Sequence, residues 1–424
     1  MAGQPRIHRV ASQGLRPAGR NHPAAGHTHD RGTGPELIQT MLTKLGPSLD
    51  KGRFYEKMGQ LVGEAVITVA GSEHTQKRRR LQPVFSRPKI ASYVDVMRSE
   101  ANAAIEEWVP GQAVDVREAM IKLSLDMLVK TVFAGSLDSA VFARLCENLS
   151  VILSGIGVRL MMPDWVERLP IAFNRRFLKA RDDIRATIGE AIAALQSSED
   201  DAGGMLSMLL LAEDEAIGRP LTDKVCSEVL TLALAGTETT ATVLSWVLYE
   251  LASRPEIEAR VLTELDQILS DRPMTFDAVD QLPYLSSVIT EALRLHHPGW
   301  IITRRTVTET RLATWTLPAG TELAYCQHAL HRDPDLYSDP LTFNPDRWLD
   351  GTLTLPPGAF VPFGGGVHRC MGERLAMTEM ITALATMLRR WRLELAPGQT
   401  VRTVAWATVR PRSLVMTVRP RKEE

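Results

Sequence analysis

A long apolar segment with helical spacing, from Asp223 to Ala252, is the feature of this sequence that most constrains its fold. Apolar residues recur there every three or four positions, and about 30 residues in a helix span on the order of 45 Å. Thr222 is a suitable N-cap, and the proline of Ser253-Arg254-Pro255 should end the helix. A helix of this length crosses a whole domain, so other helices must pack around it.

The same spacing predicts five further helices, whereas strand-like alternation appears only near the C-terminal end. The predicted helices are Ala91–Trp108, Val116–Val132, Ala140–Leu153, Ala172–Leu195 and Glu256–Leu269. The predicted strands are Thr314–Leu317, Glu322–Tyr325, Thr400–Ala407 and Ser413–Val418. The sequence therefore predicts a mainly α fold with small β-sheets.

Composition divides the chain into two unequal parts. Residues 1–34 hold five arginines against one acid among scattered Gly, Pro and His, and we expect a disordered basic tail. Residues 35–424 have globular composition without a linker or repeat, and we expect a single domain. Across all 424 residues, 49 basic side chains balance 50 acidic ones. The net charge of -1 gives no basic excess, so we expect no nucleic-acid partner.

The four cysteines limit the compartment and the kinds of metal site. Cys146, Cys226, Cys326 and Cys370 form no Cys-x-x-Cys pair, which excludes a zinc ribbon, and they are too sparse for a disulfide framework. This pattern suits a reducing compartment, and we expect a cytoplasmic protein. No uninterrupted apolar run reaches about 18 residues, and the N-terminus lacks the apolar core of a secretory signal. We therefore expect no membrane span.

The ten residues Phe363-Gly-Gly-Gly-Val-His-Arg-Cys-Met-Gly372 are the most informative in the chain. Three glycines allow the backbone to turn tightly and to approach a flat group closely. A helix should begin directly after Gly372, so Cys370 lies just before its N-terminus, where free N–H groups favour a thiolate. A thiolate surrounded by amide donors is what an axial haem ligand requires.

This segment resembles the haem-binding signature Phe-x-x-Gly-x-x-x-Cys-x-Gly of the cytochrome P450 family, and the resemblance extends from about Pro35 to the C-terminus. It implies the cytochrome P450 fold, with heme b (iron protoporphyrin IX) as cofactor and Cys370 as the iron ligand. It also implies propionate contacts from a His-x-x-x-Arg pair and from an arginine of Thr303-Arg304-Arg305, where Arg305 is the alternative to Arg304. The implied cofactor-binding residues are His74, Arg78, Arg304, Phe363, Gly366, His368, Cys370 and Gly372.

Glycine and threonines interrupt the long helix at Ala235-Gly-Thr-Glu-Thr-Thr240. These residues are poor choices for a helix interior, and such local exceptions occur at functional sites. The P450 resemblance places an oxygen-activating acid–alcohol pair here, which corresponds to Glu238 and Thr239. Their implied role is to deliver protons so that O–O cleavage releases water.

Glu291 and Arg294 lie at i and i+3 on one helix face, where such a pair is usually a solvated ion pair of little energetic value. The resemblance instead implies a buried pair joined by an arginine from a Phe-x-Pro-x-Arg segment, which Phe343–Arg347 supplies. The implied triad Glu291–Arg294–Arg347 is structural and supports the region behind the cysteine loop. Lys77, Arg79 and Arg80 are expected to be solvated and to dock an acidic redox partner.

The substrate pocket implied by the family is apolar, which favours a lipophilic small molecule without a carboxylate or amine. Its candidate residues are Leu230, Ala233, Leu234, Trp300, Ile301, Ile302 and Trp406. The stretch Arg294–Trp300 is similar to bacterial terpene hydroxylases, so a terpenoid substrate is expected.

The function implied by the resemblance is that of a bacterial-type haem-thiolate monooxygenase active in secondary metabolism. The chain has no Gly-x-Gly-x-x-Gly motif and no room for a fused reductase, so electrons should come from a separate ferredoxin and ferredoxin reductase to a monomeric enzyme. Two alternatives stay open at this point: a peroxide-dependent or isomerising haem-thiolate enzyme, and a non-catalytic haem sensor. The sequence departs from the family ahead of Pro35–Leu49, where a helix and two sheet strands are expected to be missing or replaced.

Overall fold

The central helix of the structure is α10 (Leu221–Ser253). The structure is a computed structural model that describes residues 34–421, apart from 135–136, 198–203, 215–219, 350, 352, 397–398, 400 and 406–407. The predicted disordered tail lies outside the described residues, except for its last residue. Pro220 stands at the N-cap position of α10, so the predicted N-cap at Thr222 is wrong and this threonine lies in the first turn. The predicted end is confirmed, because α11 begins at Pro255.

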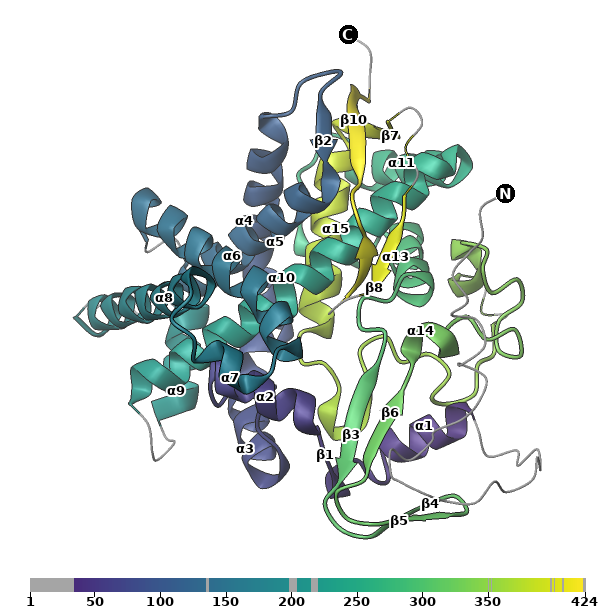
Figure 1. Ribbon diagram of the computed structural model, residues 1–424. Helices are drawn as coiled ribbons and strands as arrows, with labels where there is room; N and C mark the ends of the chain where they lie inside the picture. The colour runs from purple at the N-terminus through teal and green to yellow at the C-terminus, as the bar shows by residue number, and fades with distance from the viewer. Residues whose placement is uncertain are drawn as a thin grey trace.

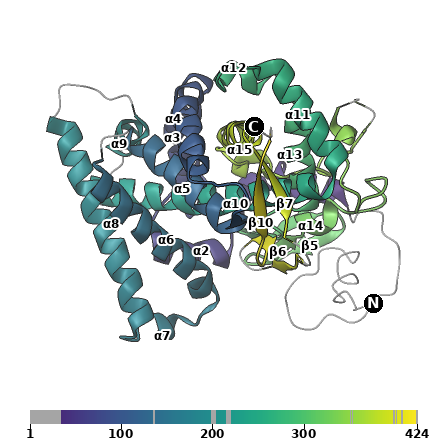
Figure 2. The same ribbon diagram turned by 90° about the horizontal axis from the view of Figure 1, so that it is seen from above.

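Helices surround α10 on most sides (Figures 1 and 2). It packs against α5 most extensively, while α4 packs against α15 and α6 against α8. The other helices are α1 (Pro35–Leu42), α2 (Arg53–Val62), α3 (Gly71–Leu81), α4 (Arg87–Glu106), α5 (Val116–Phe133), α6 (Ser139–Met161), α7 (Asp164–Glu167), α8 (Ala172–Ser197), α9 (Met205–Asp214), α11 (Pro255–Leu269), α12 (Phe276–Val279), α13 (Pro283–Leu295), α14 (Gln327–Leu330) and α15 (Glu373–Leu388). The helices predicted from periodicity are all present, with boundaries that differ most at the end of α6.

Aspartates fix the starts of two of these helices. The side chain of Asp115 accepts hydrogen bonds from the backbone N–H groups of Arg117 and Glu118 at the start of α5. Asp138 accepts from Ala140 and Val141 in the same way at the start of α6, at 2.9 Å each. Both caps satisfy backbone donors that have no partner inside the helix.

Short antiparallel strands form small sheets at two ends of the helical body (Figure 1). One sheet has the order β1-β3-β6, another has the order β2-β10-β7, and β4-β5 and β8-β9 form two-stranded ribbons. The register pairs Leu49 with Thr306 and Ile302 with Tyr325 in the first sheet. The strands are β1 (Leu49–Asp50), β2 (Ala113–Asp115), β3 (Ile302–Thr306), β4 (Thr310–Leu312), β5 (Trp315–Leu317), β6 (Glu322–Tyr325), β7 (Trp391–Leu395), β8 (Thr403–Ala405), β9 (Val409–Pro411) and β10 (Val415–Pro420).

The buried apolar residues form two hydrophobic cores. The larger core lies among the helices around α10, and the smaller one joins α1 to the sheet that contains β3 and β6. In the described part of the chain, the stretch Ser139–Leu160 of α6 alone is long and apolar enough to cross a bilayer by length and mean hydropathy. A core helix passes the same test, and Leu145, Leu149 and Ile152 of α6 are buried in the larger core.

Candidate active site

The cysteine loop lies between the smaller core and the start of α15. Its glycines are required by geometry: Gly364 and Gly366 have φ values of 69° and 60°, a region that side chains with a Cβ disfavour. A Cβ at Gly366 would also overlap the carbonyl oxygen of Leu42 in α1. The loop is closed by a hydrogen bond of 2.8 Å from the N–H of Cys370 to the carbonyl of Phe363. The loop and α1 therefore fit together through backbone contact.

Cys370 precedes α15, which begins at Glu373 as the sequence predicts. The residue is exposed in the protein alone, yet enough protein surrounds its sulfur for burial to raise the pKa of the thiol. The backbone N–H of Gly372, Arg78 and Arg369 oppose this rise without overcoming it. The N–H of Gly372 lowers the pKa, as expected near a helix N-terminus, but in the protein alone desolvation outweighs the amide and arginine contributions. A coordinated metal ion deprotonates a thiol outright.

Five basic residues from four segments form a cluster beside the loop, which we call the cation cluster: Lys51, His74, Arg78, Arg304 and His368. The rings of His74 and His368 lie 4.7 Å apart. Burial, then Lys51, Arg78 and Arg304, lower the pKa of His74 to about 4. Burial, then Arg304, His74 and Lys51, lower the pKa of His368 to about 3. The cluster thus disfavours further positive charge.

The cation cluster fits the two carboxylates of a haem. Both ring nitrogens of His368 are buried without a hydrogen-bond partner, although the backbone of Leu49 lies near. Buried polar atoms are rarely left without partners, so an anion beside these nitrogens accounts for them. On the opposite side, a Cβ at Gly236 of α10 would meet no atom within 4 Å, and Ala235 is exposed in mid-helix. Basic groups, Cys370 and open space beside α10 together match a haem.

Arg304 and Arg305 point to different partners. Arg304 is 5% exposed and acts electrostatically on Lys51, His74 and His368. The guanidinium of Arg305 instead pairs with Asp50 at 2.7 Å and with Glu56. Since two carboxylates already occupy Arg305, Arg304 is the residue available to a haem carboxylate.

Sequence reasoning missed Lys51. It is 7% exposed, and its Nζ donates to the carbonyls of Val66 and Ile67 at 2.7 and 2.9 Å. Burial and the nearby Arg304 lower its pKa to about 7. No motif marks this position, and only the pairing of β1 with β3 places it beside Arg304.

We expect Lys51 to make haem binding pH-dependent. Above about pH 7 its amine is neutral, so binding a haem carboxylate there requires proton uptake and weakens by up to about tenfold per pH unit. Ligation by the Cys370 thiol releases a proton and acts in the opposite direction. The measurement is therefore the haem affinity of the wild type divided by that of Lys51→Met. This ratio should fall as the pH rises from about 7 to about 9. A ratio that stays constant over this range would assign the role to another group.

The acid–alcohol pair of α10 is divided between two environments. The Thr239 hydroxyl donates to the carbonyl of Ala235 at 2.5 Å, on the open side of the helix. Glu238 instead accepts a hydrogen bond of 2.9 Å from Thr408, and the Nε of Arg410 in β9 lies 3.7 Å from the same oxygen.

Two cavities lie at the site, one beside Cys370 and the other beside Glu238. One cavity of about 850 Å³ is lined by Cys370, Arg78, Arg369 and Arg374 and by no residue of α10, so it reaches Cys370 from the side away from Thr239. A second, of about 500 Å³, lies between α5, α6, α8 and α10, and Glu238 lines it.

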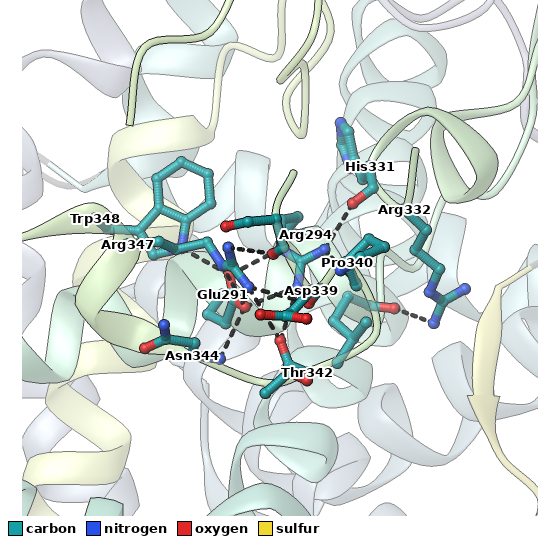
Figure 3. Close-up of polar contacts among 12 residues, drawn as sticks. Glu291, Arg294, His331, Arg332, Asp339, Pro340, Thr342, Asn344, Arg347 and Trp348 are labelled. Atoms are coloured by element: carbon teal, nitrogen blue, oxygen red, sulfur yellow. Dashed lines mark hydrogen bonds and ion pairs between the residues drawn. The ribbon is translucent and has the colours of Figure 1, made fainter. Parts of the chain in front are cut away.

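The predicted triad is assembled and fully enclosed (Figure 3). Arg294 forms a bidentate pair with Glu291 at 2.9 and 2.8 Å, and Arg347 Nε donates to Glu291 at 3.0 Å. Trp348 Nε1 and the N–H of Asn344 complete the carboxylate shell at 2.8 and 2.9 Å. Glu291 and Arg294 are both 0% exposed. Arg294 also donates to three backbone carbonyls, those of His331, Pro340 and Thr342.

Two histidines that sequence reasoning did not assign hold the start of the cysteine loop. His297 bridges the carbonyls of Gly299 and Pro362, at 2.8 and 2.7 Å. His331 Nε2 lies 3.2 Å from the N–H of Val361 and accepts its hydrogen bond. Within the described ranges, no cluster of three or more His, Cys, Asp or Glu side chains is arranged to bind a metal ion.

The predicted pocket residues differ in exposure. Leu230 and Ala233 are packed into the larger core, whereas Leu234, Trp300 and Ile302 are half-buried and Ile301 is exposed. Trp406 lies outside the described residues.

Lys77 corrects one prediction. It was expected to be solvated, but it is buried because it faces α9 and α10, where it pairs with Glu213 and Glu228. Arg79 is exposed, as expected, and Arg80 is half-buried.

Comparisons with known proteins identify the family of this chain. A sequence profile described as "Cytochrome P450" matches residues 26–419. Cyclooctat-9-en-7-ol 5-monooxygenase of Streptomyces melanosporofaciens is 40% identical over 371 residues, which cover 87% of this chain and 80% of that protein. Pentalenene oxygenase of Streptomyces avermitilis is 33% identical over 383 residues, which cover 90% of this chain and 85% of that protein. The crystal structure of the cytochrome P450DA heme domain is similar with a TM-score of 0.81 at 24% identity, and it covers 92% of this chain and 86% of that one.

The family match spans nearly all of the described chain, and two relatives that share more than 30% identity are named as oxygenases. P450 enzymes generally take electrons from redox partners and act on lipophilic molecules. The chain belongs to the cytochrome P450 family and is a haem-thiolate monooxygenase with heme b as its cofactor.

Proposed function

We propose that this monooxygenase inserts one oxygen atom into a C–H or C=C bond of a terpenoid. The observation that carries the proposal is the 40% identity to cyclooctat-9-en-7-ol 5-monooxygenase, a name that describes oxidation of a terpene alcohol. Pentalenene oxygenase, at 33% identity, supports the same class of substrate. Leu234, Ile301 and Ile302 offer apolar surface and no charged anchor, which suits a hydrocarbon skeleton.

Cys370 would ligate the iron, and Arg78, Arg304, His74 and His368 would bind the haem carboxylates. When bound, the haem supplies the redox-active iron at which dioxygen is cleaved and one oxygen atom is transferred. Two electrons and two protons reduce the other oxygen atom to water. The protein therefore has to move protons to this site while keeping bulk water away from it.

Glu238 and Thr239 would deliver those protons. Glu238 lines the cavity of about 500 Å³ together with Arg117, Glu118 and Glu147, which gives its carboxyl group a polar surrounding for proton exchange. The hydroxyl of Thr239 lies on the open side of α10, where it can pass a proton toward the oxygen being reduced. Movement of Glu238 away from Thr408 would connect the two residues.

Replacing Thr239 with alanine is expected to lower the product formed per NAD(P)H by about tenfold and to raise peroxide release, because one hydrogen bond worth about 1.4 kcal/mol is lost. The measurement is product and peroxide yield in a reconstituted electron-transfer system. The control is Thr240→Ala, since Thr240 is buried on the same helix, 3% exposed. An unchanged yield in Thr239→Ala would contradict the proton-delivery role.

We further propose that the electron donor is a ferredoxin with an acidic surface, reduced by a ferredoxin reductase. The cavity of about 850 Å³ brings Arg78, Arg369 and Arg374 to the side of Cys370 that faces away from α10. Arg79 is exposed on the adjoining α3. Arginine side chains there would steer an acidic partner toward the cysteine loop.

Screening diterpene and sesquiterpene alcohols and hydrocarbons tests the proposal. Binding should shift the haem absorbance, and turnover with a surrogate ferredoxin and reductase should give a product heavier by one oxygen atom. A protein that binds carbon monoxide when reduced yet oxidises none of these compounds would favour the sensor alternative. Turnover with peroxide alone at the same rate would favour a peroxide-dependent enzyme.

A further inference from the structure

A network of buried ions joins three helices on one side of the site. The Nζ of Lys77 in α3 lies 2.7 Å from Glu213 of α9 and 3.1 Å from Glu228 of α10. The three side chains are 8%, 1% and 2% exposed. Two carboxylates thus surround one ammonium group where the helices meet.

Glu228 also binds the main chain of a fourth segment. The N–H of Val66 donates to its two carboxylate oxygens at 3.0 and 3.3 Å. From the other side, Lys51 donates to the carbonyls of Val66 and Ile67. The backbone of Val66 and Ile67 is therefore held between the buried Glu228 carboxyl group and the buried Lys51 amine. This peptide belongs to the segment Gly63–Ala70, which leads directly into α3.

Stability alone does not explain this arrangement. Burying charges is expensive, and well-packed apolar residues of the same volume are often as stable. One oxygen of Glu213 is buried without a partner, and burial raises the pKa of Glu228 to about 7 even with Lys77 opposing. Buried ions are retained in some proteins because they fix one arrangement of the chain.

We propose that Glu228 and Lys51 are positioning residues that hold α3 in register with α10. Glu228 is attached to α3 through Lys77 and to the preceding segment through Val66, so α3 cannot shift without breaking both contacts. This helix carries His74 and Arg78, and α10 carries Glu238 and Thr239. The network thereby sets the spacing between the groups that bind the haem carboxylates and the groups that deliver protons. The inference rests on the haem site of the proposed function.

Variants of Glu228 in the haem-loaded protein test this role. Glu228→Met removes the acceptor for Val66, and we expect amides of the segment 63–70 and of α3 to exchange hydrogen about tenfold faster. Haem transfer to excess apomyoglobin should quicken by a similar factor. Glu228→Gln keeps an acceptor oxygen for Val66 and should stay within about threefold of wild type in both measurements. The control is Glu100→Met, which breaks the pair of the buried Glu100 with the exposed Lys130 at 2.6 Å and should change neither rate.

Lys51→Met provides the second test, because it leaves the ion network of Lys77, Glu213 and Glu228 intact. Exchange of the 63–70 amides should again rise, even if Glu228→Met does not fold. The inference would be overturned if hydrogen exchange of these amides were unchanged in Lys51→Met. It would also be overturned if Glu228→Met and Glu100→Met, compared at matched melting temperature, lost haem at equal rates. Both readouts are independent of substrate, so failure to oxidise any terpenoid would count against the proposed function and leave this result standing.

Discussion

Replacing Cys370 with serine is expected to slow the monooxygenase reaction strongly and to remove the strongly red-shifted Soret band of the reduced, carbon monoxide-bound protein. A serine hydroxyl does not ionise readily, so the iron would lose the electron-rich ligand that favours O–O cleavage. We expect the rate of product formation to fall by on the order of 1,000-fold, which corresponds to about 4 kcal/mol of transition-state stabilisation.

The matched control for this variant is Cys146→Ser. Cys146 is a half-buried thiol of α6 whose pKa burial raises to about 12, and it takes no part in the site. Its replacement should leave both the absorbance band and the rate unchanged. Retention of the red-shifted band in Cys370→Ser would mean that another residue ligates the iron.

The second large effect is expected for Arg294→Ala, which should give less than about a tenth of the wild-type yield of haem-loaded protein. The change removes the bidentate partner of Glu291, which is 0% exposed, and leaves the carbonyls of His331 and Pro340 without the donor that Arg294 provides. Breaking a buried ion pair by removing one partner costs about 3–5 kcal/mol, a large share of the roughly 5–15 kcal/mol that stabilises a protein.

Two comparisons show whether this effect comes from burial and geometry. Arg294→Lys keeps the charge but not the forked geometry, so its haem content should lie between those of wild type and Arg294→Ala. Lys179→Ala breaks an exposed pair with Asp183 on α8 and should change stability by less than about 1 kcal/mol. Haem content and melting temperature are the measurements. Full haem loading of Arg294→Ala would contradict the prediction that the triad Glu291–Arg294–Arg347 supports the haem site.

Features encoded in local sequence could be predicted well. The long helix, its end before Pro255 and the start of α15 after Gly372 follow from apolar spacing, proline and glycine. Resemblance to the P450 family placed the triad, whose contacts then proved to be direct ion pairs. The start of α10 was mispredicted because Thr222 has good capping chemistry, while the helix begins at Leu221, two residues before the predicted start at Asp223.

Features that depend on long-range packing could not be predicted. Lys77 lies in a run of basic residues that looks solvated, and only the approach of α9 and α10 buries it with two carboxylates. Lys51 enters the cation cluster because β1 pairs with β3, some 250 residues later in the chain. Likewise, nothing local shows that His297 holds the carbonyl of Pro362.

The backbone contact between α1 and the cysteine loop has a consequence for how the protein is made. Leu42 and Gly366 touch in the folded protein but are separated by roughly 320 residues of chain. At typical synthesis rates of about 5–20 residues per second, α1 leaves the ribosome roughly 16–65 seconds before the loop exists. The smaller core around α1 must therefore wait for the last part of the chain, and the cofactor can be captured only when translation is nearly complete.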